Sequence, residues 1–480
     1  MGYKEGADKY QLTLLPMCLD EYVPEDHICR VISAFTKRLD MVKLNFKYAD
    51  CKETGNRPYD PRMMLDLYLY GYLHRVRSSR RLHAETTRNV EVMWLMDGLT
   101  PDDKTICNFR KDNAKPLREV FRAFVRLLRQ LELYGGEVEA TDSTKFRANN
   151  SRRNNHNQTT VERELSRIDK KISEYMNALD QADQEEEGTA APTAEEIRTA
   201  LEKLNQRKDK FEELLSRVET EGEVSTVDPD ARLMRSGGDA RPLDVSYNVQ
   251  TVADDKHNLI VEFDLAERSD DKGCFHAMSK MAMDILETET LTNLGDKGYY
   301  DGEDIAACEE SGVTCLVAKP KAGGAQKGEG FTRENFIYDR EQDCYLCPAQ
   351  NRLRFMRIQE HSDGKEYRIY ANYAACRICP RRAECTRAKH RQIYRPLYQD
   401  TLDIVDERTR RNKGLYRRRQ EIVEHPFGTI KGVWGFKQFL CRGKKMVTAE
   451  TALAYLAYNL RRVYNIFQGD TGELIAAMGA

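Results

Sequence analysis

Apolar side chains in the first part of the chain recur every three or four residues, which is the spacing of amphipathic α-helices. The pattern is clear over residues 63–73 and again over residues 117–131, where Gly135 and Gly136 follow it. Glycine tolerates backbone angles through which a helix cannot continue. We therefore predict a helical N-terminal domain over residues 1–134.

The apolar period changes from that of helices to that of strands directly after the glycine pair. Val138, Ala140 and Asp142 lie two residues apart, so they share one face of a predicted strand. An aspartate that ends an apolar strand face either caps the strand edge or is presented to chemistry. Asp142 is therefore the first candidate functional residue.

Further strands and a helix are predicted after residue 223. Residues 246–255 and 258–267 predict a β-hairpin, residues 276–286 predict a helix, and the segment that begins at Leu291 predicts a buried strand ending at Asp296. Strand, hairpin, helix and strand form an α/β order. Functional groups of open α/β sheets gather at the carboxyl ends of strands, which makes Asp296 the second candidate.

A seven-residue apolar repeat separates the first strand from these later strands. Two stretches, 159–182 and 197–218, carry apolar residues at alternating spacings of four and three, and the acidic, proline-containing segment DQEEEGTAAPT joins them. This repeat is typical of helices in a coiled coil, so we predict an inserted antiparallel hairpin over residues 157–222. Lys208 interrupts the second stretch. The repeat positions are Val161, Leu165, Ile168, Ile172, Tyr175 or Met176, Leu179, Ile197, Leu201, Leu204, Phe211, Leu215 and Val218.

The length and composition of the chain indicate how many hydrophobic cores it can form and in which compartment we expect it. The chain has 480 residues, of which 40% are hydrophobic and 32% charged, so several modest cores are expected. No apolar run is long enough to span a membrane, and the N-terminal segment lacks the residue order of a secretory signal. We expect a globular, cytosolic protein with no membrane partner.

The charge is distributed unevenly along the chain. The formal net charge is only -2, which argues against a nucleic-acid partner, because phosphate binding needs clustered lysine and arginine. Between Arg381 and Lys445, however, there are eighteen lysines or arginines and seven acids. This segment can carry a phosphate-binding face; the alternative is a solvated helical surface.

Cysteines supply the most specific spacing in the sequence. There are thirteen, an odd number, so reduced thiols or metal ligands are favoured over disulfides. Two Cys-x2-Cys pairs, with Cys385 and His390 close behind, predict a zinc-ribbon-like β region over residues 326–394. A fully thiolate-ligated zinc ion is structural; the alternative is a set of ordinary reduced cysteines. The predicted ligands are Cys344, Cys347, Cys376 and Cys379, with Cys385 as a further candidate.

The stretch YRRRQEIVEHPFGTIK places a carboxylate inside the basic segment. Glu424 and Lys431 are seven residues apart, so an ideal helix would turn them to nearly the same side. Pro426 predicts a kink or a new helix start just past Glu424. Taken alone, the pattern also fits a surface ion pair within a helix.

Three separate acids match one chemical requirement. Transfer at a DNA phosphodiester places negative charge on the attacking and leaving oxygens, and two Mg²⁺ ions held by carboxylates stabilise both. Mg²⁺ prefers oxygen ligands and retains water, so a few carboxylates and the substrate phosphate suffice. Nearby basic and aromatic residues would seat phosphates and stack on bases.

The motifs ATDSTKFRAN, NLGDKGYYD and YRRRQEIVEHPFGTIK together resemble those of DDE-type insertion-sequence transposases, which have an RNase H-like core and a Tyr-Arg-Glu-Lys signature. YGYLHRVRSSRRL and PDDKTICNFR resemble the helical N-terminal domain of that group, and YNLRRVYN resembles its final helix. The resemblance covers nearly the whole chain outside the hairpin, and some relatives carry a cysteine-rich insertion. The signature here reads Y-x2-R-x4-E-x6-K where x3 is usual, and Asp-Ser-Thr-Lys replaces the more usual Asp-Gly-Thr-Lys.

The resemblance implies an α/β fold with an RNase H-like catalytic core over residues 135–325 and 395–480. The two insertions would then be the coiled-coil hairpin, as a spacer or as a dimerisation and DNA-reaching arm, and the zinc-ribbon-like region. It also implies that Asp142, Asp296 and Glu424 are catalytic and bind two Mg²⁺ or Mn²⁺ ions. Tyr416, Arg419 and Lys431 would contact phosphate.

The function that the resemblance implies is a DNA transposase. It would bind terminal inverted repeats, cut by metal-activated water and join the freed 3′ hydroxyl to target DNA, as a homodimer in the bacterial nucleoid. One alternative is an RNase H-like nuclease that does not join strands. The other is a catalytically inactive DNA-binding regulator.

Overall fold

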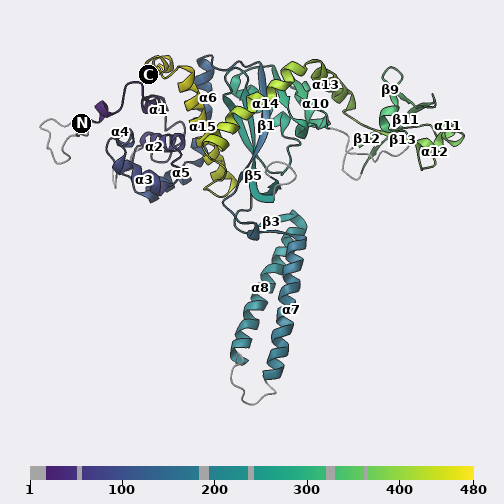
Figure 1. The fold of residues 1–480 in the computed structure, drawn as a ribbon, viewed down its shortest axis with the longest axis horizontal. Helices are drawn as coiled ribbons and strands as arrows, with labels where there is room; N and C mark the ends of the chain where they lie inside the picture. Colours follow the sequence, from purple (N-terminus) through teal and green to yellow (C-terminus); the bar gives the residue numbers. More distant parts are fainter. Residues whose placement is uncertain are drawn as a thin grey trace, which may run out of the picture.

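The computed structural model describes residues 18–50, 57–182, 194–235, 243–320, 330–361 and 366–479. The molecule is elongated, with helices at one end, a sheet covered by helices in the middle and a small β module at the other end (Figure 1). Two long helices project from the middle region. The expected boundary near residue 325 and the segment joining the two long helices lie outside the described residues.

The N-terminal region is helical, as predicted. One cluster of buried residues runs through these helices and continues along α15 (Lys444–Ile466), which packs against α2 and α6. The last helix, α16 (Thr471–Met478), packs against α1. The other elements are η1 (Leu19–Tyr22), α1 (Ile28–Lys37), α2 (Pro61–Leu73), α3 (Ser79–Arg88), α4 (Val90–Leu95), α5 (Asp103–Asp112) and α6 (Ala114–Gln130).

A mixed sheet forms the centre of the molecule, with strand order β4-β5-β1-β7-β8 and with β6 also paired to β5. β5 is antiparallel to β1 and β6, whereas β7 is parallel to β1 and β8. The predicted hairpin is present as β5 and β6. The strands are β1 (Val138–Arg147), β4 (Arg232–Arg235), β5 (Leu243–Asp254), β6 (Ile260–Ala266), β7 (Leu291–Gly295) and β8 (Val313–Val317).

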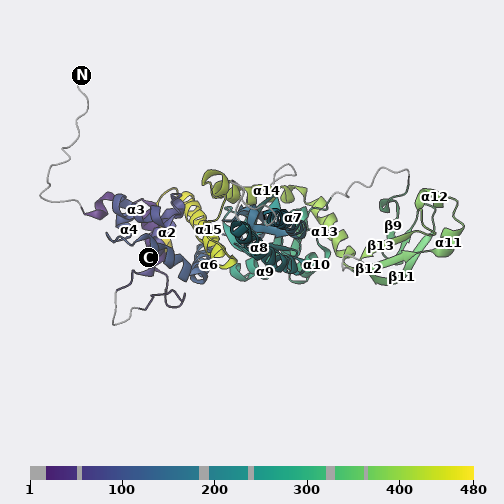
Figure 2. The same ribbon diagram turned by 90° about the horizontal axis from the view of Figure 1, so that it is seen from below.

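Helices cover both faces of this sheet. Figure 2 shows α14 (Lys413–Phe427) on one side and α9 (Phe275–Leu286) and α10 (Gly302–Glu310) on the other. Ala140 of β1 is buried with Ile422 and Val423 of α14. On the other face, Asn293 donates hydrogen bonds to Thr141 at 2.8 Å and to Ser279 of α9 at 2.7 Å. The predicted alternation of β1 is therefore confirmed, and its Asp142 face is the α14 face.

The two helices predicted from the seven-residue repeat are present as α7 (Gln158–Ala182) and α8 (Ala194–Glu221). They lie side by side and point away from the sheet (Figure 1). A short ladder of β2 (Asn155–Asn157) with β3 (Glu223–Ser225) joins their bases, after η2 (Arg152–Asn154). Val161 and Val218 are buried together near this ladder.

The cysteine-rich region forms a separate antiparallel sheet of order β13-β12-β11-β10-β9. It lies beyond α13 (Gln399–Arg411) at the end of the molecule opposite the N-terminal helices (Figure 1). Its elements are η4 (Arg333–Asn335), β9 (Ile337–Asp339), β10 (Cys344–Leu346), β11 (Arg352–Glu360), β12 (Glu366–Ala371), α11 (Tyr373–Arg377), α12 (Arg382–Cys385) and β13 (Gln392–Pro396).

The new helix start predicted after Glu424 is not found, whereas the alternative of a kink at Pro426 stays a prediction. α14 continues through Pro426, and a π-helical segment, η5 (Gly428–Val433), follows it directly. Proline removes one backbone donor, and the wider π turn is a way for a helix to continue past an interrupted hydrogen-bond ladder. The wider turn also changes the angle between Glu424 and Lys431 from that of an ideal helix.

Candidate active site

The pairing of β1 with β7 brings the first two candidate aspartates together. Thr141 of β1 is opposite Gly295, the last residue of β7, in a parallel register. Asp142 directly follows Thr141, and Asp296 directly follows Gly295. Since neighbouring strands lie about 4.8 Å apart, the two aspartates emerge side by side at the carboxyl end of β7.

A tight turn follows Asp296 and holds its carboxylate. Asp296 is the N-cap of η3 (Lys297–Tyr299), and its Oδ1 accepts a hydrogen bond from the backbone N–H of Gly298 at 2.6 Å. A Cβ atom at Gly298 would lie 2.8 Å from Asp296 Oδ1 and 3.2 Å from Asp271 Oδ2. Glycine at this position therefore allows two carboxylates to approach one backbone turn.

Asp271 is a third acid at this edge that the sequence analysis did not select. It lies in the loop after β6, and β6 runs parallel to β1 because both strands are antiparallel to β5. Asn248 and Gln250 of β5 donate hydrogen bonds to Asp271 Oδ1 at 2.9 and 2.8 Å. The signal was available, because an acidic pair, Asp270-Asp271, follows a predicted strand.

Charges around Asp271 connect it to β1. Lys145 Nζ lies 3.5 Å from Asp271 Oδ1 and donates a hydrogen bond to Ser143 Oγ at 3.0 Å. Burial opposes ionisation of Asp271, but the positive charge of Lys145 and the hydrogen bonds outweigh it and lower the pKa of this carboxyl. Asp271 is therefore a carboxylate at neutral pH.

Tyr299 shows that the three aspartates share one neighbourhood. Its hydroxyl is buried and donates to Gln250 Oε1 at 2.5 Å. Burial raises the pKa of Tyr299, and the negative charges of Asp271, Asp142 and Asp296 raise it further. All three acids therefore lie within electrostatic range of one buried ring.

Two residues of the predicted signature, Tyr416 and Arg419, extend from α14 to the edge of the sheet where the aspartates lie. Arg419 Nη1 lies 3.0 Å from Asp142 Oδ2, and the Tyr416 hydroxyl donates to the carbonyl oxygen of Gly295 at 3.1 Å. Burial raises the pKa of Asp142, the Arg419 guanidinium lowers it, and the nearby Asp296 raises it. The like charge of Asp296 contributes to the raised pKa of Asp142, and a bound cation would relieve this contribution.

Glu424 is on the same helix but does not touch the aspartates. It is exposed, and its Oε1 accepts a hydrogen bond from Gln420 Nε2 at 2.6 Å. Within the described parts of the chain, no hydrogen bond or ion pair joins it to Asp142 or Asp296. Five residues separate it from Arg419, which corresponds to about 7.5 Å along a helix axis.

Lys431 contacts the far part of β1. Its Nζ donates to the carbonyl oxygen of Lys145 at 2.7 Å and lies 4.7 Å from the centre of the Phe146 ring. Residues of α14 and η5 thus lie along β1 from Asp142 to Phe146. The structure brings Asp142, Asp296, Tyr416 and Arg419 together, with Glu424 and Lys431 further along the same segment.

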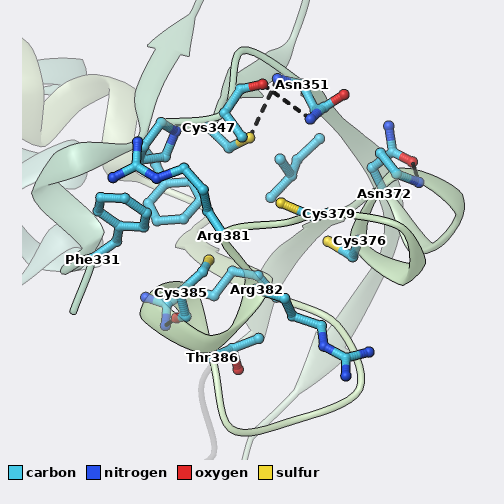
Figure 3. A pocket seen from close by; sticks show the side chains of 16 residues that line it. Phe331, Cys347, Asn351, Asn372, Cys376, Cys379, Arg381, Arg382, Cys385 and Thr386 are labelled. Atoms are coloured by element: carbon cyan, nitrogen blue, oxygen red, sulfur yellow. Dashed lines mark hydrogen bonds between the residues drawn. The ribbon is translucent and has the colours of Figure 1, made fainter.

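The cysteine candidates gather in a different grouping from the predicted one. Cys347, Cys376, Cys379 and Cys385 line one hollow of the β module, and Cys344 does not (Figure 3). Cys344 precedes Tyr345 on β10, and consecutive strand residues point to opposite faces. Tyr345 packs in the buried cluster that Cys347 and Cys385 contact, so Cys344 faces the other way.

A further group of potential metal ligands, His27, Cys29 and Glu91, lies among the N-terminal helices. Burial strongly raises the pKa of the Cys29 thiol, which keeps it protonated. Glu91 accepts a hydrogen bond from the Tyr70 hydroxyl at 2.7 Å and pairs with His27 at 3.5 Å. The three ligand atoms lie close enough together to hold a metal ion, and in this structure Glu91 is held by Tyr70 and His27.

Two family models match separate parts of this chain. Residues 17–112 match the Transposase domain (DUF772), and residues 346–464 match the Transposase DDE domain. The first match covers the N-terminal helices, and the second covers α14 with Glu424. No curated protein and no solved structure matches the chain.

The two matches support a DDE transposase of an insertion sequence, which confirms the resemblance expected from the motifs. DNA is the substrate that this class of protein implies. Among the described helices, none combines the length and apolar character that a membrane span requires.

Proposed function

We propose that this chain is a DNA transposase that binds the terminal inverted repeats of its element and catalyses strand cleavage and strand transfer. The observation that carries the proposal is the β1–β7 register, which sets Asp142 beside Asp296 under the helix that carries Glu424. In this proposal the central sheet is an RNase H-like core. The antiparallel β5 between β1 and β6, with parallel β7 and β8 on the other side of β1, supports that assignment.

The proposed catalytic residues are Asp142, Asp296 and Glu424, and the proposed cofactor is a pair of Mg²⁺ or Mn²⁺ ions. The oxygen-rich donor set fits these hard cations, and the unfavourable proximity of Asp142 and Asp296 is what a cation would relieve. Bound there, two such ions activate a water or a 3′ hydroxyl and stabilise charge on the attacking and leaving oxygens.

The chain's own residues have distinct proposed tasks around these carboxylates. Asp142 and Asp296 would hold the cations from the sheet side, and Glu424 would hold them from the helix side. Arg419, which pairs with Asp142 in this structure, would then be available to pair with a DNA phosphate. Tyr416 and Lys431 contact phosphate at the two ends of the segment.

The surface of α14 supports DNA as the partner. Lys413 and Arg417 are exposed on this helix, so they can contact the backbone on either side of the reacting phosphate. The proposed assembly is a homodimer with two paired ends, to which α7 and α8 contribute a contact arm, acting on nucleoid DNA in a bacterial cytoplasm.

The test is an assay of the purified chain on linear DNA that carries the element's ends, with a plasmid as target. We expect Mg²⁺-dependent nicks at the ends and covalently joined products. Nicks without joined products would favour an RNase H-like nuclease. Metal-independent binding without cleavage under any divalent ion would favour an inactive regulator. Retained activity in Asp142→Ala would refute the assignment of that residue.

A further inference from the structure

The β module contains four thiols from two segments that line one hollow. Cys347 lies just after β10, whereas Cys376, Cys379 and Cys385 lie within ten residues of one another in and around α11 and α12. Figure 3 shows the four sulfur atoms arranged around the same space. The hollow therefore receives one ligand from the sheet and three from the helical segment that follows β12.

The backbone at these cysteines is turned in a way that suits thiolates. The N–H of Asn351 donates to Cys347 Sγ at 3.3 Å, across a turn closed by a hydrogen bond from Gln350 N to Cys347 O at 2.8 Å. A second turn is closed from Cys379 N to Cys376 O at 3.5 Å. Hydrogen bonds from outside the ligand set orient metal ligands and offset their charge.

Three arginines line the same hollow. Arg381, Arg382 and Arg391 surround it, and Arg391 Nη1 donates to the carbonyl oxygen of Cys385 at 3.2 Å. Arg391 Nε is buried and has no hydrogen-bond partner within the described residues. A divalent cation on four thiolates carries a net charge of about -2, so nearby guanidinium groups would offset it.

The hydrophobic core of the module is small. Its buried cluster consists of five side chains, and a β region of this size rarely folds stably on such a core without a disulfide, a metal or a partner. All five cysteines of the module are free thiols. A metal is therefore the linkage that these residues offer. The five side chains are Phe336, Tyr345, Leu353, Tyr370 and Ile393.

We propose that Cys347, Cys376, Cys379 and Cys385 bind one Zn²⁺ ion in a closed tetrahedral site, and that Cys344 is not a ligand. Soft thiolates select zinc among the common divalent cations, and four of them leave no coordination position for catalysis. The ion is structural and connects the sheet of the module to its helical segment. The proposal does not depend on the chemistry at Asp142.

Binding also requires a movement that can be measured. No three of the four sulfur atoms lie within 4.8 Å of one another. This is too far for all four to form zinc–sulfur bonds of about 2.3 Å to one ion. Side-chain rotation must bring them together, so the bound and stripped forms differ in the accessibility of these thiols.

The first experiment uses the unmodified full-length chain. Its zinc content is measured by mass spectrometry of the metal, and each cysteine is then labelled with an alkylating reagent before and after chelation. We expect one zinc per chain and a chelator-dependent rise in labelling of the four proposed ligands. Cys344 is buried in the sheet, so a rise in its labelling reports loss of the module's fold and not loss of a metal bond. Absence of zinc after reconstitution, or labelling of Cys385 that does not depend on the chelator, would overturn the proposal.

The second experiment compares Cys385→Ser with the matched variant Cys344→Ser, both loaded with Co²⁺ as a spectroscopic probe. We expect the Cys344→Ser protein to retain the absorption of tetrahedral cobalt with four thiolates. We expect the Cys385→Ser protein to lose it and to bind Zn²⁺ roughly 100-fold more weakly or worse. Equal loss in both variants, or loss only in Cys344→Ser, contradicts the ligand set. Intact DNA cleavage with no zinc separates this failure from failure of the transposase proposal.

Discussion

Arg419 lies 3.0 Å from Asp142, so a guanidinium of α14 neutralises the carboxylate that β1 presents beside Asp296. This contact links the third of the three sequence motifs to the first, across 277 positions of the chain. The carboxylate that we propose as a cation ligand is therefore already paired with a basic side chain.

Replacing Arg419 should change the pH dependence of cleavage. Arg419 lowers the pKa of Asp142 against the effect of burial, so Arg419→Ala raises that pKa. Cations bind the deprotonated carboxylate, and the acid limb of the activity profile should therefore move to higher pH. The measurement is the rate of end cleavage across pH, with Arg417→Ala as the control: loss of this exposed cation can lower the rate but should leave the position of the acid limb unchanged. An unchanged acid limb in Arg419→Ala would count against the pairing.

Asp271 should be required for cleavage although it is outside the predicted triad. Its carboxylate fixes Lys145, Asn248 and Gln250 at the acidic edge. We expect Asp271→Ala to lower the cleavage rate by about 10- to 100-fold, the usual effect of losing a residue that orients metal ligands. The neighbouring Asp270→Ala is the control, since Asp270 is exposed. Equal rates in both variants would show that Asp271 is dispensable.

Gly298→Ala should impair activity more than stability. The added methyl would meet the flexible ends of Asp296 and Asp271, which can move aside but then leave their positions. We expect the melting temperature to change little and the cleavage rate to fall by about 10-fold or more. Gly414→Ala, where the added methyl meets open space, should behave like the wild type in both measurements. A fully active Gly298→Ala protein would show that the carboxylate positions are not critical.

The free energy of unfolding should decrease as the pH is raised from mildly acidic to alkaline values, because Asp66 then loses its proton. This carboxyl is buried in α2 and accepts a hydrogen bond from Thr36 Oγ1 at 2.6 Å, and burial raises its pKa to about 8. A carboxyl with a raised folded-state pKa stabilises the fold at pH values below its unfolded pKa near 3.8, and this contribution is lost as pH rises through about 8. The loss is on the order of a few kcal/mol.

Thermal unfolding of Asp66→Asn at several pH values tests this expectation. The amide cannot ionise, so the difference in melting temperature between pH 5 and pH 9 should shrink in the variant. Asp97→Asn, at an exposed position with a positive φ that asparagine tolerates, is the control and should keep the wild-type dependence. A wild-type pH dependence in Asp66→Asn would contradict the assignment.

Periodicity in the sequence was sufficient to predict much of the fold. The alternation of Val138, Ala140 and Asp142 correctly gave the face of β1, and the seven-residue repeat correctly gave two long neighbouring helices. Such patterns indicate which face of a single helix or strand is buried, and this depends only on residues within that element. The meeting of Asp142 with Asp296 could also be expected, since parallel strands end at one edge of a sheet.

Features that depend on contacts between elements could not be read from the sequence. Asp271 acts from a loop, and only the parallel course of β6 brings it to the same edge. Cys344 looked like one half of a Cys-x2-Cys pair, but the strand β10 includes it and turns it to the other face. Pro426 predicted a kink or a new helix start, yet α14 continues through it, and Phe427 packs against the same buried cluster as Ile422 and Val423. In each case tertiary packing decided between two locally acceptable conformations.

Glu424 is the proposed catalytic acid that has no contact with the other two. Glu421 is exposed on the same helix and serves as its matched control. The most direct measurement is therefore Mg²⁺-dependent strand transfer by Glu424→Gln and by Glu421→Gln on the same end-containing DNA. We expect Glu424→Gln to lose both cleavage and joining by about 1000-fold or more while still binding the DNA, and Glu421→Gln to remain active. Strand transfer by Glu424→Gln at the rate of Glu421→Gln would contradict a centre made of Asp142, Asp296 and Glu424.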